Sequence, residues 1–314
     1  MAYNDARQRL ADYQHLSDAA AQLMDKLPED LRPAFFEMVG YPMMASYQMN
    51  RKFLLAQVNH EQAQAGHVAE ANWAAKQAQM AFDSIASLNM RYNTLLDGKW
   101  ANMMALAPGW VAKYQNMPEV SYVDGAGEKP VDLSPQEDQN RLEGCAVVDL
   151  QKAVLHAGKG MTMRRMKGIG YDWVAVQMGE AAQPSADPQR LDGSRVECEL
   201  PRMEADSVTV YVYTLPFFPL HVGKGSNRFG ISVDGQPAVV AQNAPKEFSV
   251  EWKTQVLRNG ALAKATFAID SSKEKHLLTL TCGDPGVMIQ RIVVDWGGLQ
   301  RTYVGPSACL SKAD

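Results

Sequence analysis

Hydrophobic residues recur at every third or fourth position through the first hundred residues of the chain. This spacing places them along one side of a helix. It predicts three long helices over residues 4–27, 29–60 and 67–97, followed by a short helical turn before Pro108. Gly40 and Pro42 should kink the second helix, because proline removes a backbone donor and crowds the preceding turn. Short connections between long helices favour an antiparallel bundle over residues 1–106.

Residues 107–144 have a different composition, rich in proline and glycine. A structureless segment of this length is unusual in a compact protein. We therefore expect an extended linker that packs on the surface, with Trp110, Tyr114 and Tyr122 holding it to a neighbouring element.

From Cys145 onward the pattern becomes an alternation of apolar and polar residues, which is typical of strands. The predicted strands cover residues 146–150, 171–178, 195–200, 207–215, 228–233 and 263–269, with a final pair at 276–282 and 287–296. The basic cluster at residues 164–167 suits a half-exposed strand. Asp234-Gly235, Asn259-Gly260 and the run 283–286 supply turn residues that favour hairpins. The alternation breaks at Gln290 and Arg291, which indicates a β-bulge or a strand buried on both faces.

These patterns together predict an α+β multidomain chain, in which an antiparallel helical bundle precedes an antiparallel β-sandwich over residues 145–314. The composition is that of an ordinary globular protein, with 46% hydrophobic and 21% charged residues. A net charge of -4 gives no electrostatic reason to expect nucleic acid or an anionic membrane as a partner. No apolar run is long enough to cross a bilayer, and the first residues lack the apolar core of a signal peptide. The location of the full-length protein is left open, since Met1 need not be its natural start.

The four cysteines are scattered in apolar contexts, which favours buried free thiols over a disulfide. His60 and His67 do not have the spacing that places two imidazoles on one helix face. The glycine-rich stretches at 158–170 and 223–230 do not fit a phosphate loop. Glu204 and Asp206 are interpreted as solvated turn residues. The sequence therefore predicts no catalytic residue, no metal site and no cofactor.

Residues 207–219, SVTVYVYTLPFFP, contain the one aromatic pattern that suggests a ligand. Tyr211 and Tyr213 share one face of the strand, and Val208, Val210 and Val212 share the other. Aromatic rings stack on the apolar faces of sugars, so a glycan platform is one interpretation. Covering of the tyrosines by another element or by a partner domain is the other.

Three stretches of the chain resemble the C-terminal portion of glycoside hydrolase family 115, the xylan α-1,2-glucuronidases. They are LRPAFFEMVGYPMMASYQMN (31–50), RYNTLLDGKWANMM (91–104) and most of residues 214–306, including ISVDGQP and HLLTLTCGDPGVMIQRIVVDWGG. The resemblance implies a parent activity that removes (4-O-methyl)glucuronic acid from xylan. It also implies that the catalytic acids belong to an N-terminal domain and a (β/α)8 barrel that this chain does not match. Gln290 and the pair Arg301-Thr302 depart from the family pattern, which puts a ligand role for the last strands in doubt.

The resemblance leaves three interpretations open. The first is a non-catalytic scaffold and homodimerisation module for the missing catalytic half. The second is a module that binds xylan or xylo-oligosaccharides through Tyr211, Tyr213 or Trp296. In the third, the helical motifs form a wall of the active-site cleft through six polar and aromatic residues: Tyr41, Asn50, Tyr92, Asn93, Lys99 and Trp100. The alternative is that Asn50, Asn93 and Lys99 cap helices or bond backbone groups, and that Trp100 fills the bundle.

Overall fold

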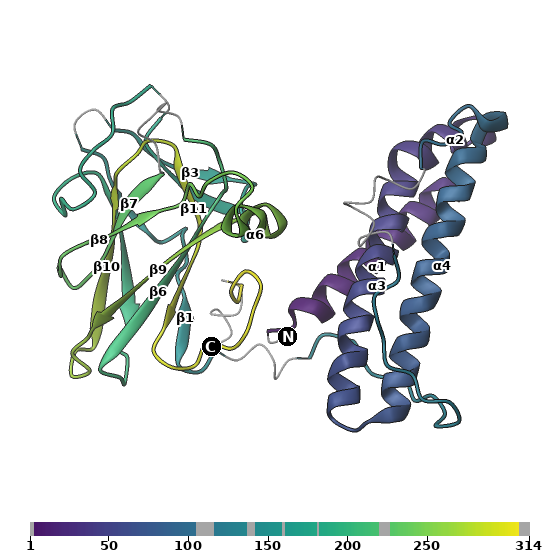
Figure 1. Cartoon of the computed structure of the whole chain (residues 1–314). Coiled ribbons are helices and arrows are strands. Elements are labelled where there is room, and N and C mark those ends of the chain that lie inside the picture. Colours follow the sequence, from purple (N-terminus) through teal and green to yellow (C-terminus); the bar gives the residue numbers. More distant parts are fainter. Residues whose placement is uncertain are drawn as a thin grey trace. The chain divides into compact units, whose positions relative to one another are not determined.

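The computed structural model describes residues 3–104, 116–136, 142–158, 161–180, 182–219 and 227–307 (Figure 1). The chain divides into two compact units, residues 4–136 and residues 137–314, and Tyr3 belongs to the second. The first unit is helical and the second consists of antiparallel sheets, so the predicted fold class is confirmed.

The helical unit contains the three long helices that the sequence predicts. Its elements are α1 (Asp5–Lys26), the 3-10 turn Glu29–Leu31, α2 (Arg32–Phe35), the π-helical turn Phe36–Gly40, α3 (Tyr41–Gln64) and α4 (Val68–Gly98). Where the sequence predicts a kink, the structure has the π-helical turn, which ends at Gly40, two residues before Pro42. Leu96 and Asp97 have positive φ angles of 51° and 55°, which ends α4 where the sequence predicts a stop.

The contact between α3 and α4 depends on small side chains. Five alanines of α4 are buried: Ala71, Ala74, Ala75, Ala78 and Ala81. Small residues let two helix backbones approach closely. The alanine-rich pattern therefore explains why these two helices pack along their length.

Residues 116–136 are held to the helices by polar side chains. Asn59 donates to Ser121 O (2.7 Å) and accepts from Ser121 N–H (2.8 Å). Asn72 makes the same pair of bonds with Val123, at 2.8 and 2.9 Å. Tyr122 is exposed, so the expectation that it pins this segment is wrong. Trp110 and Tyr114 lie outside the described residues.

The second unit is a sandwich of two antiparallel sheets. One sheet has the order β3 (Met163–Lys167), β4 (Val174–Met178), β11 (Val287–Asp295), β6 (Ser207–Thr214) and β9 (Ala261–Ala268), and β1 (Cys145–Val147) also pairs with β11. The other has the order β2 (Val154–His156), β5 (Arg195–Pro201), β10 (Lys275–Cys282), β7 (Arg228–Val233) and β8 (Val239–Gln242). The inward side chains of both sheets form one core, which includes Met178, Val212, Phe229, Leu280 and Ile292.

Three details differ from the sequence predictions. The strands β10 and β11 exist as predicted, but they belong to different sheets, so the turn at residues 283–286 carries the chain across the sandwich. The short strands β2 and β8 were not predicted. Residues 250–258 form a helix, α6 (Val250–Arg258), and Asn259 is its left-handed C-cap, so the prediction of a hairpin turn at Asn259-Gly260 is wrong.

The predicted irregularity at Gln290 is confirmed as a β-bulge. The register of β11 against β6 shifts between Ile289 and Arg291. The bulged Gln290 is buried, and its amide donates to Thr214 O (3.1 Å). Within the described part of the chain, no helix has the length and apolar character to cross a membrane.

Candidate functional site

The two family-like helical motifs meet at one end of the bundle. The rings of Tyr41 and Tyr92 pack edge-on with centroids 4.9 Å apart, beside Phe36. Tyr41 donates its hydroxyl hydrogen to Asn89 Oδ1 at 2.7 Å. Burial raises the pKa of Tyr41 above its ordinary value. This phenol is therefore a neutral hydrogen-bonding group of the bundle.

Three more predicted residues, Asn93, Lys99 and Trp100, lie at or just after the C-terminal end of α4. Asn93 holds the next turn by accepting from Met104 N–H (2.9 Å) and donating to Met104 O (3.3 Å). The Lys99 ammonium lies 4.8 Å from the centre of the Trp100 ring, a cation–π contact. The Trp100 Nε1 is buried and has no acceptor among the described residues. The structure thus brings five of the six helical candidates to one place.

Asn50, the sixth candidate, lies apart from this cluster and has a structural contact. It accepts a hydrogen bond from Arg9 Nε and donates to Ser46 O at 2.8 Å. The bond from Arg9 connects α1 to α3, and the bond to Ser46 lies within α3.

The aromatic residues of the sandwich are less available than the sequence suggested. Tyr213 is 3% exposed and packs edge-on against Tyr171, with centroids 6.1 Å apart. Trp296 is partly buried against the sandwich core. Tyr211 is half-buried. Of the three predicted sugar-stacking residues, Tyr213 is covered by Tyr171 from the β3–β4 loop, whereas Tyr211 and Trp296 are each partly buried.

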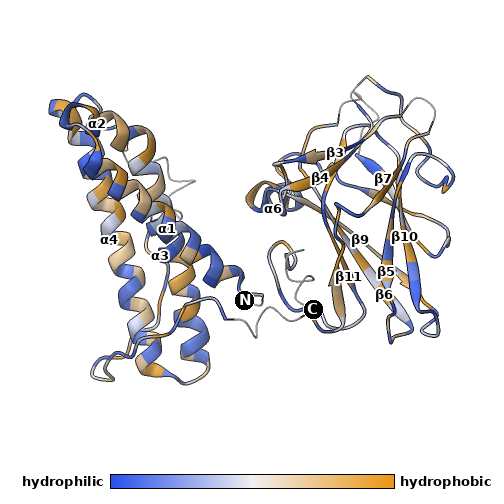
Figure 2. Cartoon of the chain, turned by 180° about the vertical axis from the view of Figure 1, so that it is seen from behind, coloured by the Kyte–Doolittle hydropathy of each residue, from blue (hydrophilic) through white to orange (hydrophobic). Residues whose placement is uncertain are grey.

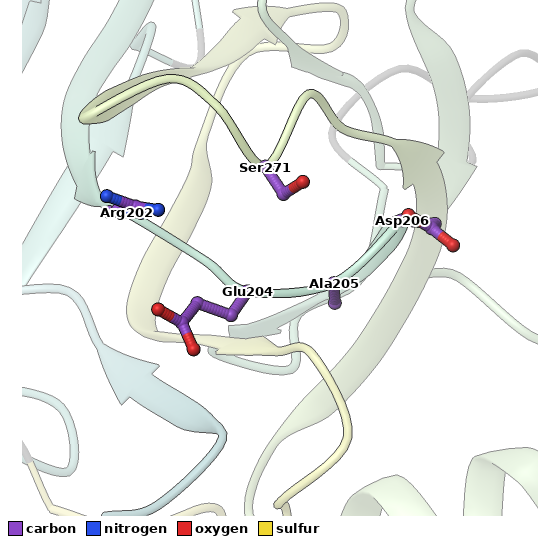
Figure 3. Close-up of a pocket in the computed structure, with 5 residues that line it drawn as sticks. All are labelled: Arg202, Glu204, Ala205, Asp206 and Ser271. Atoms are coloured by element: carbon purple, nitrogen blue, oxygen red, sulfur yellow. The ribbon is translucent and has the colours of Figure 1, made fainter.

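A shallow pocket of about 430 Å³ opens between the β5–β6 and β9–β10 connections (Figure 3). It is lined by Arg202, Glu204, Ala205, Asp206 and Ser271. Glu204 and Asp206 are exposed, and their carboxylates point in different directions in Figure 3. Glycosidases need two carboxyl groups that face each other across the scissile bond. This pair does not have that arrangement, which agrees with the prediction of solvated turn residues.

An ion pair joins the β10–β11 connection to β7. Asp284 accepts from Arg228 N–H (2.9 Å) and from the Arg228 guanidinium (2.8 Å). Burial alone would raise the pKa of Asp284, but these bonds outweigh it and lower that pKa to about 2. The carboxylate is charged at neutral pH and holds the turn, so it is unsuited to act as an acid.

Three cysteines and His67 have structural surroundings in the described part of the chain. Cys145, Cys198 and Cys282 are buried and free, as predicted, and burial raises the pKa of Cys198 and Cys282 to about 12. Cys309 lies outside the described residues. His67 Nδ1 bonds Gln62 Oε1 at 2.9 Å. No cluster of three His, Cys, Asp or Glu residues in the described ranges is placed to hold a metal ion.

The sequence analysis did not predict one group of exposed apolar side chains, because it interpreted Asn259-Gly260 as a hairpin turn and not as the end of a helix. Phe248, Val250, Val256 and Leu257 lie on and just before α6, and all four are exposed. Ser249 with Glu251 in the first turn is an N-terminal helix signal that could have revealed this element.

Comparisons with known proteins bear on both units. Residues 154–308 match the family model of the glycosyl hydrolase family 115 C-terminal domain. A solved family 115 4-O-methyl-α-glucuronidase, described as specific for decorated arabinogalactans, is similar over 94% of this chain, with 26% sequence identity and a TM-score of 0.70. The chain covers 33% of that enzyme, so it spans a third of its length.

Carbohydrate-binding modules are more distant. A family 35 module from Clostridium thermocellum is 9% identical over 48% of this chain and 98% of its own, with a TM-score of 0.32. That likeness is too weak to bear on function. Curated proteins gave no match to the sequence.

Proposed function

Since the chain belongs to glycosyl hydrolase family 115 as a C-terminal part, we propose that it is a non-catalytic scaffold and dimerisation module for a catalytic N-terminal part. The parent activity in this proposal is the hydrolytic removal of (4-O-methyl)glucuronic acid. We propose xylan as the polysaccharide, from the resemblance of the helical and strand motifs. The solved relative acts on decorated arabinogalactans, and it has the released sugar in common with this proposal.

One observation carries the proposal. The relative matches almost the whole of this chain, helical and sandwich units together, while two-thirds of the relative has no counterpart in it. The described residues agree, because the exposed Glu204 and Asp206 diverge and the buried Asp284 is fixed by Arg228. None of these three carboxylates has the facing arrangement that a glycosidase needs, which supports the proposal.

The experiment is to add the purified 314-residue polypeptide to glucuronoxylan and measure release of methylglucuronic acid. We expect no release, with circular dichroism showing that the polypeptide is folded. Release above the rate of a heat-denatured sample would overturn the non-catalytic role. A second experiment begins with the DNA upstream of Met1. If an in-frame region there encodes a catalytic barrel, that part can be produced separately, and its activity can be measured with and without this polypeptide.

The alternative function is glycan binding by the sandwich, and the observation that favours it is the exposure of aromatic rings. Trp173 is 73% exposed and Tyr211 is half-buried. Such rings can stack on sugars. Titration with xylo-oligosaccharides, followed by tryptophan fluorescence, tests it, and Trp173→Ala is the matched variant. A lack of response at millimolar sugar would remove this alternative.

The helical cluster is proposed as a wall of the catalytic cleft in the full enzyme. Lys99 and Trp100 are the residues that we expect to face the substrate, because an ammonium pairs with a uronate carboxylate and an indole stacks on a sugar. Tyr92 and Asn93 support them from behind, since Tyr92 is buried and Asn93 holds the following turn. In the assembled enzyme, Lys99→Met should raise KM for glucuronoxylan, whereas the exposed Lys76→Met on the same helix should not.

A further inference from the structure

The guanidinium of Arg91 lies over the ring of Phe36 at one end of the helical unit. Its Cζ is 3.9 Å from the ring centre, which is a close cation–π contact. Phe36 is fully buried, whereas Arg91 is exposed. The ring therefore covers one face of the guanidinium, while Arg91 as a whole remains accessible to solvent.

The ring that supports Arg91 is itself fixed by the π-helical turn Phe36–Gly40. A Cβ on Gly40 would lie 3.2 Å from Phe36 Cδ2, so glycine lets the ring pack closely on this turn. The ring of Tyr41 packs edge-on against Phe36, with centroids 6.2 Å apart. Figure 2 shows hydrophobic and hydrophilic residues in close alternation at this end of the bundle, beside α2. Since π-helical turns are frequent at functional sites, this fixed support for Arg91 suits a binding role.

The hydrogen-bonding groups of Arg91 are largely unused. Nη2 donates to Met24 Sδ at 3.4 Å, and a thioether sulfur is a weak acceptor. No carboxylate of the described residues pairs with this guanidinium. In the sandwich, by contrast, arginines pair with carboxylates: Arg164, Arg190, Arg195, Arg202, Arg228 and Arg291. Because a guanidinium has five donors, most of those of Arg91 are available to a further acceptor.

We propose that Arg91 binds the carboxylate of a glucuronic acid side chain of the substrate. The planar guanidinium matches a carboxylate through two parallel hydrogen bonds, which fix the orientation of the sugar as well as its charge. This inference rests on the proposed function, since it names the contact that distinguishes an acidic sugar from a neutral one. In this assignment Lys99 adds a second, point-like charge, and Arg91 sets the orientation.

The residues around Arg91 favour a sugar over a carboxylate on a protein. Trp100 packs on the same cluster as Phe36 and Met24. Its Nε1–H is buried without an acceptor among the described residues, and a sugar hydroxyl is an acceptor for such a donor. A uronate presents a carboxylate, hydroxyl groups and an apolar ring face together, so it suits a guanidinium, an indole N–H and an aromatic ring. A protein carboxylate would use only the guanidinium.

Two opposing effects set the affinity of the polypeptide for a free uronate. An ion pair that is open to water contributes little, because solvent screens it. The ring contact already orders the Arg91 side chain, so less conformational entropy is lost on binding. We therefore expect a dissociation constant on the order of 10 mM for free glucuronate.

Titration of the full 314-residue chain with sodium glucuronate, followed by NMR of the arginine Nε–H groups, tests the inference. The variant Arg91→Lys identifies the Arg91 signal, because that signal is missing from its spectrum. We expect the Arg91 signal to shift saturably with glucuronate and to stay in place with glucose. The Nε–H of Arg32 donates to Leu27 O at 3.0 Å, so its signal is the internal control and should not shift.

Kinetics of the assembled enzyme supply the second test. Arg91→Lys keeps the charge and removes the fork, so KM for glucuronoxylan should rise about tenfold or more while kcat changes little. Arg32→Lys, an exposed position on the same helical unit, is the matched control and should leave both constants unchanged. Circular dichroism of each variant verifies that the helices remain folded.

The outcomes separate this inference from the proposed function. If the shift is absent, or is equal with sodium acetate, the uronate site is wrong and the scaffold role stands. If catalysis does not depend on this polypeptide, the proposed function is wrong, and a saturable, glucuronate-specific shift of the Arg91 signal still supports the site. If Arg91→Lys weakens association with the catalytic part and leaves KM unchanged at saturating polypeptide, the ligand is a protein carboxylate and the inference is overturned.

Discussion

Arg291 and Asp172 form a two-pronged ion pair on the six-stranded sheet, with Nε 2.8 Å from Oδ2 and Nη2 2.7 Å from Oδ1. Arg291 Nη1 also donates to Val304 O (3.0 Å) and Gly305 O (2.8 Å). The two side chains are only 5% and 14% exposed. One guanidinium therefore joins the bulged strand β11, the β3–β4 loop and the C-terminal segment.

Removing one partner of this pair should destabilise the sandwich strongly. Asp172→Asn leaves a buried guanidinium without its counter-charge, and we expect a loss of about 3 kcal/mol in the free energy of unfolding. Urea denaturation followed by tryptophan fluorescence measures it. The control is Asp192→Asn, because the Arg190–Asp192 pair is exposed and should contribute less than about 1 kcal/mol. Equal losses for both variants would contradict the assignment.

Asp284 should make the stability of the sandwich depend on acid pH. Its pKa in the folded protein is about 2, below the value of about 3.9 for an unfolded chain. A carboxyl group whose folded pKa is depressed stabilises the protein above its unfolded pKa, and this contribution is lost as the pH falls through the folded pKa. We expect roughly 2 kcal/mol to be lost between about pH 4 and pH 2.

Carboxyl carbon NMR measures that pKa directly. The variant Asp284→Asn should remove this part of the pH dependence and lower the stability at pH 7. A measured pKa near 4 for Asp284 would refute the argument, whatever the stability of the variant.

Local sequence patterns predicted most of the helices and strands, whereas the shortest strands depend on pairing with distant parts of the chain. The alternation broken at Gln290 was enough to predict the bulge, because a phase change in the apolar pattern is a local signal. The helix α6 was missed because Asn259-Gly260 serves a helix C-cap as readily as a hairpin, since both require a positive φ. The strands β2 and β8 are three and four residues long, and pairing with β5 and β7 defines them.

The candidate site was predictable to a similar degree. Tyr41 belongs to one helical motif, and Tyr92 and Asn93 belong to the other. The three residues lie close together because both motifs are near the same end of an antiparallel bundle. The sequence could not show that Tyr213 is covered, since the covering Tyr171 is 42 residues away and on another strand connection. Ion pairs such as Asp172 with Arg291, 119 residues apart, have no local signature.

The buried thiols should be unreactive in the folded chain. Burial raises the pKa of Cys198 and Cys282 to about 12, so almost no thiolate is present at pH 8. A thiol reagent followed by peptide mass analysis should leave both residues unmodified in buffer and modify all four cysteines in guanidinium chloride. Rapid labelling of Cys198 in the folded protein would show that the core opens readily.

The side-chain amide of Asn72 should hold residues 123–127 against the helices. Its Oδ1 accepts from Val123 N–H at 2.9 Å, and its Nδ2 donates to Val123 O (2.8 Å) and Gly127 O (3.1 Å). Asn72→Ala leaves the Val123 N–H without this acceptor, which costs about 1 to 3 kcal/mol locally. Hydrogen exchange at the Val123 amide should therefore become at least about tenfold faster.

Two comparisons within the same helical unit make this prediction specific. The Ser121 amide is held by Asn59 and should keep its protection in Asn72→Ala, since that bond is unaffected. Gln79→Ala, an exposed position on the same helix whose amide bonds only Asp83 among the described contacts, should change neither amide. If Ser121 and Val123 lose protection together, the segment is released as one cooperative unit and the two asparagines do not act independently.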